Sequence, residues 1–189
     1  MSTETTSDTD LGTVETDGDK YVIRFERRLD HPIEEVWAAI TEPDEMIKWW
    51  GEGEVDLVEG GKFVVKWLNT DEAGNRAVMT GTITSLEPPH LLETASEEHG
   101  DLRWELRPDG DATKLNFSSK LELPEEFRTM NAAGWHWHLD ALATVLAGGE
   151  VELAAVEIVI DSPHPDHGHS PTAMRGWNEI HQRYVAKLG

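Results

Sequence analysis

The sequence contains no cysteine in 189 residues, which excludes disulfide bridges and a thiol nucleophile. Basic residues are also scarce: 16 lysines and arginines stand against 37 aspartates and glutamates, giving a net charge of -21 at pH 7. Such an excess of negative charge argues against nucleic acid and anionic membranes as partners. Solubility explains it most simply, and an acidic docking surface for a basic partner is the alternative.

Long apolar runs are missing as well. No stretch approaches the roughly 18–20 apolar residues that cross a bilayer, and the N-terminus lacks the basic-then-apolar pattern of a signal peptide. The sequence also lacks a glycine-rich phosphate loop after a strand, a serine in a nucleophile elbow and a patch of mixed basic and aromatic residues. We therefore expect a cytoplasmic protein without the common nucleotide or serine-hydrolase chemistry.

The longest helical pattern in the chain runs from Pro124 to Ala147. Within it, Trp135, Leu139 and Leu142 recur at steps of four and three residues, which places them on one helix face. Pro124 suits the first turn of a helix, and two glycines after Ala147 supply the stop. A helix this long needs a broad apolar partner.

The preceding hundred residues read as strands joined by short turns, with two short helices inserted after the first strand. Apolar and polar residues alternate, or turn residues mark the strand ends, in segments 20–29, 54–58, 61–68, 76–87, 91–95, 102–107 and 115–121. Strands joined by short turns pair antiparallel. The sequence therefore predicts an α+β fold in which a curved antiparallel sheet wraps around one long C-terminal helix.

Several short motifs in this order resemble the START-like helix-grip superfamily, also known as SRPBCC proteins. They are HPIEEVW at 31–37, MIKWWG at 46–51, GGKF at 60–63, GTI at 81–83 with the proline pair 88–89, and Gly134-Trp135 with Leu139. More narrowly, they resemble the branch named after the activator of heat-shock protein 90 ATPase homologue. The resemblance covers about residues 20–147 and implies an apolar cavity between the sheet and the long helix. It does not define a function, because this fold carries many.

The eight tryptophans fit such a cavity, since tryptophan combines a large apolar area with one hydrogen-bond donor. Alternation in the strands and the helix stripe predict residues that line or floor it or simply fill the core, and Trp50 and His138 are added as further candidates. This predicted ligand-binding set is Trp50, Phe63, Val65, Trp67, Met79, Trp104, Phe117, Trp135, His138 and Leu139.

Histidine supplies the remaining candidate chemistry. In the predicted helix His138 lies near the face of Trp135, at the cavity edge, whereas His136 is expected to point outward. No catalytic partner for His138 is placed by the sequence, so an acid or base role and a simple hydrogen-bonding role both stay open. His164, His167 and His169 lie in a loop with two aspartates, which we interpret as solvated rather than as a metal site.

The sequence predicts three parts along the chain: an N-terminal tail, one domain and a C-terminal extension. Residues 1–19 are polar and acidic and are expected to be disordered, 20–149 form the helix-grip domain, and 150–189 form a C-terminal extension. In that extension 150–160 read as a strand or packed segment, and 172–188 read as a helix with an apolar face. That face either docks on the domain or makes a homodimer contact.

The sequence as a whole favours a protein that binds a small hydrophobic molecule, without a cofactor and without enzymatic activity. An enzyme of the cyclase, dehydratase or hydrolase type on the same fold is one alternative. A co-chaperone-like interaction module is the other.

Overall fold

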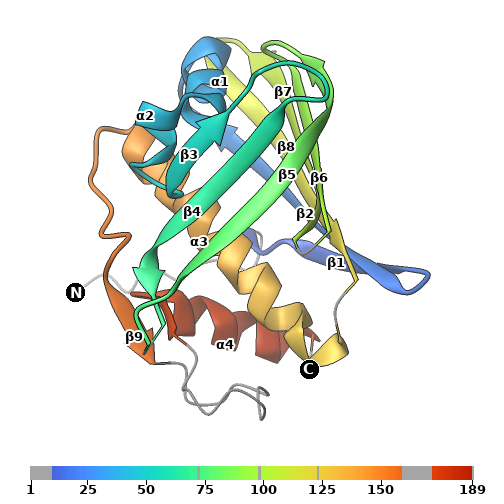
Figure 1. The fold of residues 1–189 in the computed structure, drawn as a ribbon, viewed down its shortest axis with the longest axis vertical. Helices are drawn as coiled ribbons and strands as arrows, with labels where there is room; N and C mark the ends of the chain where they lie inside the picture. Colours follow the sequence, from blue (N-terminus) through green and yellow to red (C-terminus); the bar gives the residue numbers. More distant parts are fainter. Residues whose placement is uncertain (1–9, 72, 98, 123, 159–171, 189) are drawn as a thin grey trace.

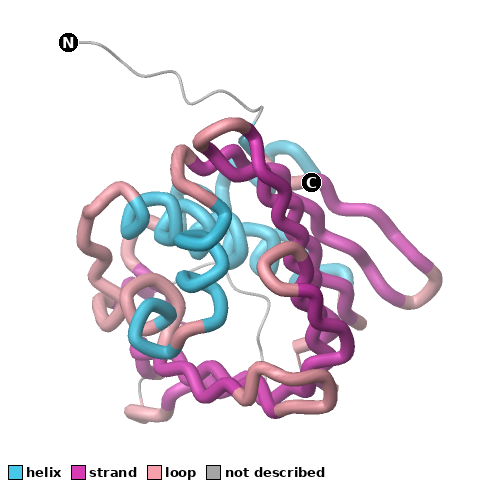
Figure 2. Tube along the Cα trace, turned by 90° about the horizontal axis from the view of Figure 1, so that it is seen from above, coloured by secondary structure: helices cyan, strands magenta, loops and turns pink. Residues whose placement is uncertain are grey.

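The computed structural model describes residues 10–188 apart from 72, 98, 123 and 159–171. Eight antiparallel strands form one curved sheet, and the long helix α3 (Arg128–Leu146) lies against its inner face (Figure 1). Figure 2 shows the strands curving around the helices. This arrangement confirms the predicted α+β helix-grip fold. Within the described residues, no helix is long and apolar enough to span a membrane.

The order of strands across the sheet is β1-β2-β8-β7-β6-β5-β4-β3. Short turns join β3 through β8, so sequence neighbours pair, while β2 closes against β8 and brings Phe25 opposite Phe117. The strands are β1 (Thr13–Asp17), β2 (Lys20–Leu29), β3 (Glu52–Val55), β4 (Lys62–Thr70), β5 (Arg76–Glu87), β6 (Leu91–Ser96), β7 (Gly100–Asp109) and β8 (Ala112–Leu121).

The remaining elements cap the open ends of the sheet and cover the long helix. A two-stranded sheet in the C-terminal extension pairs β9 antiparallel to β10. These elements are α1 (Ile33–Thr41), α2 (Pro43–Met46), the 3-10 turn η2 (Glu125–Phe127), β9 (Val156–Ile158), β10 (Thr172–Met174) and α4 (Trp177–Leu188).

Three boundaries differ from the sequence-based expectations. Thr13–Asp17 form β1 instead of belonging to a disordered tail, because a turn at Gly18 with φ of 64° lets the segment hydrogen-bond back onto β2. The long helix begins with a 3-10 turn before Arg128 and ends at Leu146, just before Gly148, whose φ of 81° makes it the predicted glycine stop. The C-terminal helix begins only at Trp177, since the residues just before it pair with β9. The first nine residues lie outside the described part of the chain.

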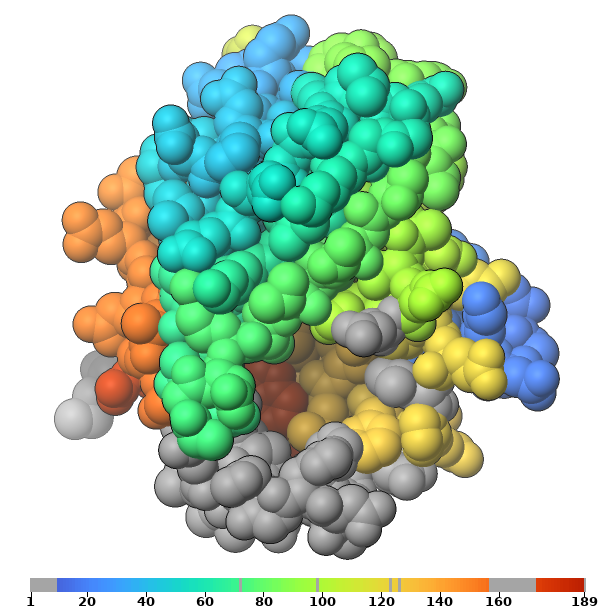
Figure 3. Space-filling view, in the orientation of Figure 1, coloured from blue at the N-terminus to red at the C-terminus, as the bar shows by residue number. Residues whose placement is uncertain are grey.

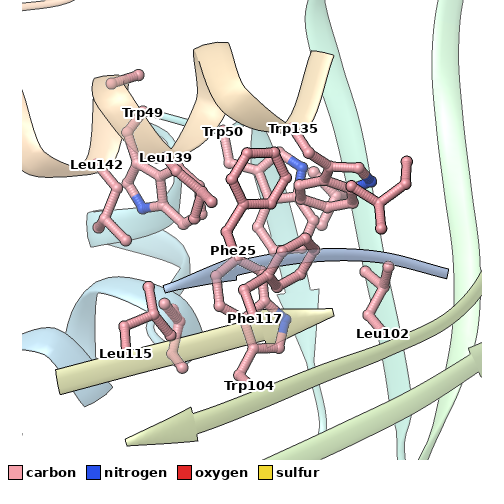
Figure 4. Close-up of a cluster of buried hydrophobic side chains, with 14 of the residues drawn as sticks. Phe25, Trp49, Trp50, Leu102, Trp104, Leu115, Phe117, Trp135, Leu139 and Leu142 are labelled. Carbon is pink, nitrogen blue, oxygen red and sulfur yellow. The ribbon is translucent and has the colours of Figure 1, made fainter. Parts of the chain in front are cut away.

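Aromatic rings fill the space between the sheet and α3 (Figure 4). Trp49 and Trp50 stack on each other with ring centres 5.2 Å apart. The Phe117 ring lies 4.3 Å from that of Trp104 and 4.5 Å from that of Trp135, so strand and helix side chains form one continuous cluster. Each ring buries a large apolar area, and tilted and edge contacts between rings add further stabilisation.

Helix α3 is buried on two opposite sides, by the sheet on one and by α4 on the other. The Tyr184 hydroxyl accepts a hydrogen bond from the backbone N–H of Gly12 at 2.8 Å and lies 3.0 Å from Nδ1 of His136. The expectation that His136 faces outward is therefore wrong: α4 and the N-terminal segment cover it, and it is 1% exposed. Trp177 and Tyr184 are also buried, so the apolar face of α4 docks on the domain through these two residues, as the first of the two expectations had it.

Candidate ligand-binding pocket

A hollow of about 380 Å³ opens between the ends of β4 and β5 and the first half of α3. Figure 3 shows the depression beside the green strand ends, with gold α3 residues and dark red C-terminal residues at its depth. We refer to it as the apolar pocket. It is lined by Trp67, Met79, His99, Leu121, Met130, Asn131, Gly134, Trp135, His138 and Met174.

Local sequence explains how the main walls arise. Met79 on β5 pairs with Val65 on β4, and Trp67 follows two residues later, so alternation turns both lining side chains to the inner face. On α3 the lining residues 130, 131, 134, 135 and 138 follow helical spacing and form one face. Gly134 leaves room on this face because it carries no side chain.

Methionine is concentrated in this pocket. Met79 comes from the sheet, Met130 from the long helix and Met174 from the extension, which makes three of the five methionines in the chain. The thioether side chain is unbranched and polarisable, so it adapts to irregular apolar shapes and contacts aromatic rings favourably. The walls therefore suit a flat or irregular apolar ligand.

The predicted ligand-binding set divides into two groups. Trp67, Met79, Trp135 and His138 line the apolar pocket. The others are at most 1% exposed and pack in the core, where the Trp50, Trp104 and Phe117 rings all lie within 6.0 Å of the Trp135 ring. This core group is Trp50, Phe63, Val65, Trp104, Phe117 and Leu139.

Six lining residues were absent from the predicted set. Met130, Asn131 and Gly134 precede His138 by eight, seven and four residues, so helical periodicity alone places them on its face. His99 and Met174 come from a turn and from the extension, and only tertiary structure brings them here. Leu121, at the end of β8, is the sixth.

His138 is held as a neutral, fully hydrogen-bonded imidazole. The indole N–H of Trp67 donates to Nε2 at 2.9 Å, and Nδ1 lies 3.4 Å from the backbone oxygen of Trp49. Indole is only a donor, so Nε2 must be the unprotonated nitrogen and Nδ1 carries the hydrogen. Burial lowers the pKa of His138 to about 4, and the hydrogen bond to Trp49 offsets only part of that effect. With both nitrogens engaged, this ring is poorly suited to proton transfer near neutral pH.

Other hollows on the described surface differ in character. The two larger ones, of about 550 and 480 Å³, are each lined by several charged side chains, including Arg183 in one and Arg103 in the other. Within the described ranges, no group of three or more His, Cys, Asp or Glu side chains is placed to hold a metal ion. The histidine loop at 164–169 lies outside those ranges.

Comparison with known proteins gives the family. The family model described as activator of Hsp90 ATPase homolog 1-like protein matches residues 30–147, more than half of the chain. The chain belongs to this family. No curated protein matches it significantly.

Solved structures agree with the fold. CalU16 from Micromonospora echinospora is 28% identical, with a TM-score of 0.55 over 72% of this chain and 83% of that one. EF2215 from Enterococcus faecalis, a conserved protein of unknown function, is 21% identical, with a TM-score of 0.64 over 94% and 90%. The AHSA1-like protein from Aeromonas hydrophila is 23% identical, with a TM-score of 0.57 over 66% and 92%.

Proposed function

We propose that this AHSA1-like protein binds a small hydrophobic molecule in the apolar pocket. The observation that carries the proposal is the lining itself: a mainly apolar set of Trp, Met and Leu side chains in the hollow between β4, β5 and the long helix. A volume of about 380 Å³ lies at the small end of the range of roughly 300–1,000 Å³ that is usual for ligand sites.

The state of His138 favours binding over catalysis. A general acid or base needs a free site for the proton and a pKa near the working pH. In this pocket Trp67 occupies the lone pair of Nε2, and the pKa of the ring is lowered to about 4. An enzyme of the cyclase, dehydratase or hydrolase type would have to draw its proton transfer from another group. A co-chaperone role rests on the family description alone.

Native mass spectrometry of freshly purified protein, before and after mild organic extraction, tests the proposal. A carrier is expected to show an adduct of apolar character that disappears on extraction. Gly134→Ala is the matched pocket variant, because it adds a methyl group at a lining residue, and the only atom within 4 Å of that group is the indole nitrogen of Trp177, 3.8 Å away. Loss of the adduct in this variant supports the site. A clean apo mass, together with no thermal shift across sterols, fatty acids and polyketides, would contradict the proposal.

A further inference from the structure

The apolar pocket combines uncharged walls with an unpaired hydrogen-bond acceptor. We propose that its ligand is an electrically neutral, largely aromatic molecule that donates one hydrogen bond, from a hydroxyl or N–H group, to the side chain of Asn131. This inference rests on the proposed function and adds the chemical class of the ligand.

The walls argue against an ionised ligand. None of the described residues that line the pocket is a lysine, arginine, aspartate or glutamate. Moving a carboxylate or ammonium group from water into such surroundings is strongly unfavourable without an opposite charge nearby. The high negative charge of the chain further disfavours an anion. Neutral molecules are therefore preferred over fatty-acid carboxylates of similar size.

The shape and polarisability of the walls favour an aromatic body. Trp135 lines the pocket from α3, and Trp67 on β4 stacks on His99 with centroids 5.6 Å apart and planes at 22°. Methionines from three different elements complete the walls. Aromatic rings and thioethers both make favourable contacts with a flat aromatic ligand.

The position of the hydrogen bond follows from the two polar side chains on α3. His138 uses Nε2 to accept from Trp67 and directs Nδ1 toward the backbone oxygen of Trp49. Asn131 lies seven residues earlier, on the same helix face, and its buried Oδ1 has no hydrogen-bond partner among the described residues. A buried acceptor without a donor is costly. A ligand hydroxyl or N–H group would remove that cost.

Three naphthalene probes of matched shape separate these features: 2-naphthol carries a donor, 2-methoxynaphthalene carries only an acceptor, and 2-naphthoate carries a negative charge. Isothermal titration calorimetry at pH 7 on the full-length protein gives the three dissociation constants. We expect 2-naphthol to bind about tenfold tighter than 2-methoxynaphthalene, the usual size of one buried hydrogen bond. We expect 2-naphthoate to bind at least tenfold more weakly than 2-methoxynaphthalene.

Asn131→Leu removes the acceptor at nearly constant volume and should abolish the tenfold preference by weakening 2-naphthol alone. Asn116→Leu, outside the apolar pocket on β8, is the matched control and should leave the preference unchanged. Equal binding of the two neutral probes, or a preference that survives in Asn131→Leu, would overturn the donor assignment while leaving the proposed function intact. Tighter binding of 2-naphthoate would overturn the neutral assignment. Binding of none of the probes would count against both the inference and the proposed function.

Discussion

Replacing His138 with glutamine should flatten the dependence of stability on pH. Glutamine can accept from Trp67 and donate to the backbone oxygen of Trp49, as the neutral imidazole does, but it does not titrate. The pKa of His138 is about 4 in the folded chain against 6.5 for an unperturbed histidine. The unfolded state therefore binds more protons between these values, and the free energy of unfolding falls as pH falls through this window.

The magnitude follows from the same two pKa values. Between pH 7 and pH 5, the wild-type protein should lose about 2 kcal/mol of unfolding free energy that His138→Gln does not lose. Urea unfolding of both proteins at the two pH values measures this difference. Because the two proteins are compared, the contributions of the other titrating groups cancel. Parallel losses in wild type and His138→Gln would refute the assignment of a buried neutral imidazole.

Two further pairs of substitutions test the packing by urea unfolding. Tyr184→Phe removes a hydroxyl that accepts a hydrogen bond from the N-terminal segment and should lower the free energy of unfolding by about 1–3 kcal/mol. Tyr21→Phe should lower it by almost nothing, because the buried Tyr21 hydroxyl has no hydrogen-bond partner among the described residues. Equal losses in the two variants would contradict the role of Tyr184. Gly51→Ala would place a methyl carbon 2.5 Å from the backbone oxygen of Lys66 and should destabilise by about 1–3 kcal/mol. Gly134→Ala meets nothing closer than 3.8 Å and should stabilise the helix by about 0.5–1 kcal/mol; the opposite order would show that the glycine environments are misassigned.

The sheet and the long helix could be predicted because their signals are local. Alternation across β7 and β8, with a turn at 110–111, specifies a hairpin without reference to the rest of the chain. The helical spacing of Trp135, Leu139 and Leu142 similarly specifies the face that meets the sheet.

The second covered face of α3 could not be predicted in the same way. His136 is polar and sits where a one-sided amphipathic helix meets water, so its spacing indicates exposure. It is buried because α4 and the N-terminal segment cover it, and Tyr184, 48 residues later on α4, supplies a hydroxyl 3.0 Å from its Nδ1. That pairing depends on how the C-terminal extension folds back, which no local pattern encodes.

The outline of the pocket was also beyond local reasoning. Trp104 and Trp67 both alternate correctly on inward-facing strands, and nothing in the sequence distinguishes them. Only packing does: the Trp104 ring is enclosed by Phe117 and Trp135, while Trp67 lies where Met174 and the helix leave space. Which inward residue lines a cavity depends on the volumes of all its neighbours.

The central claim is that ligand binds at the apolar pocket, and indole resonances in ¹H–¹⁵N correlation spectra test it most directly. On addition of 2-naphthol, we predict shifts for the Trp67 and Trp135 indoles, which line the pocket. The Trp49 indole, which donates to the backbone oxygen of Ala39 at 2.8 Å in the core, should move little and serves as an internal reference. Saturable shifts confined to Trp67 and Trp135 would support the claim. Shifts that spare both, or no shifts at all, would contradict it.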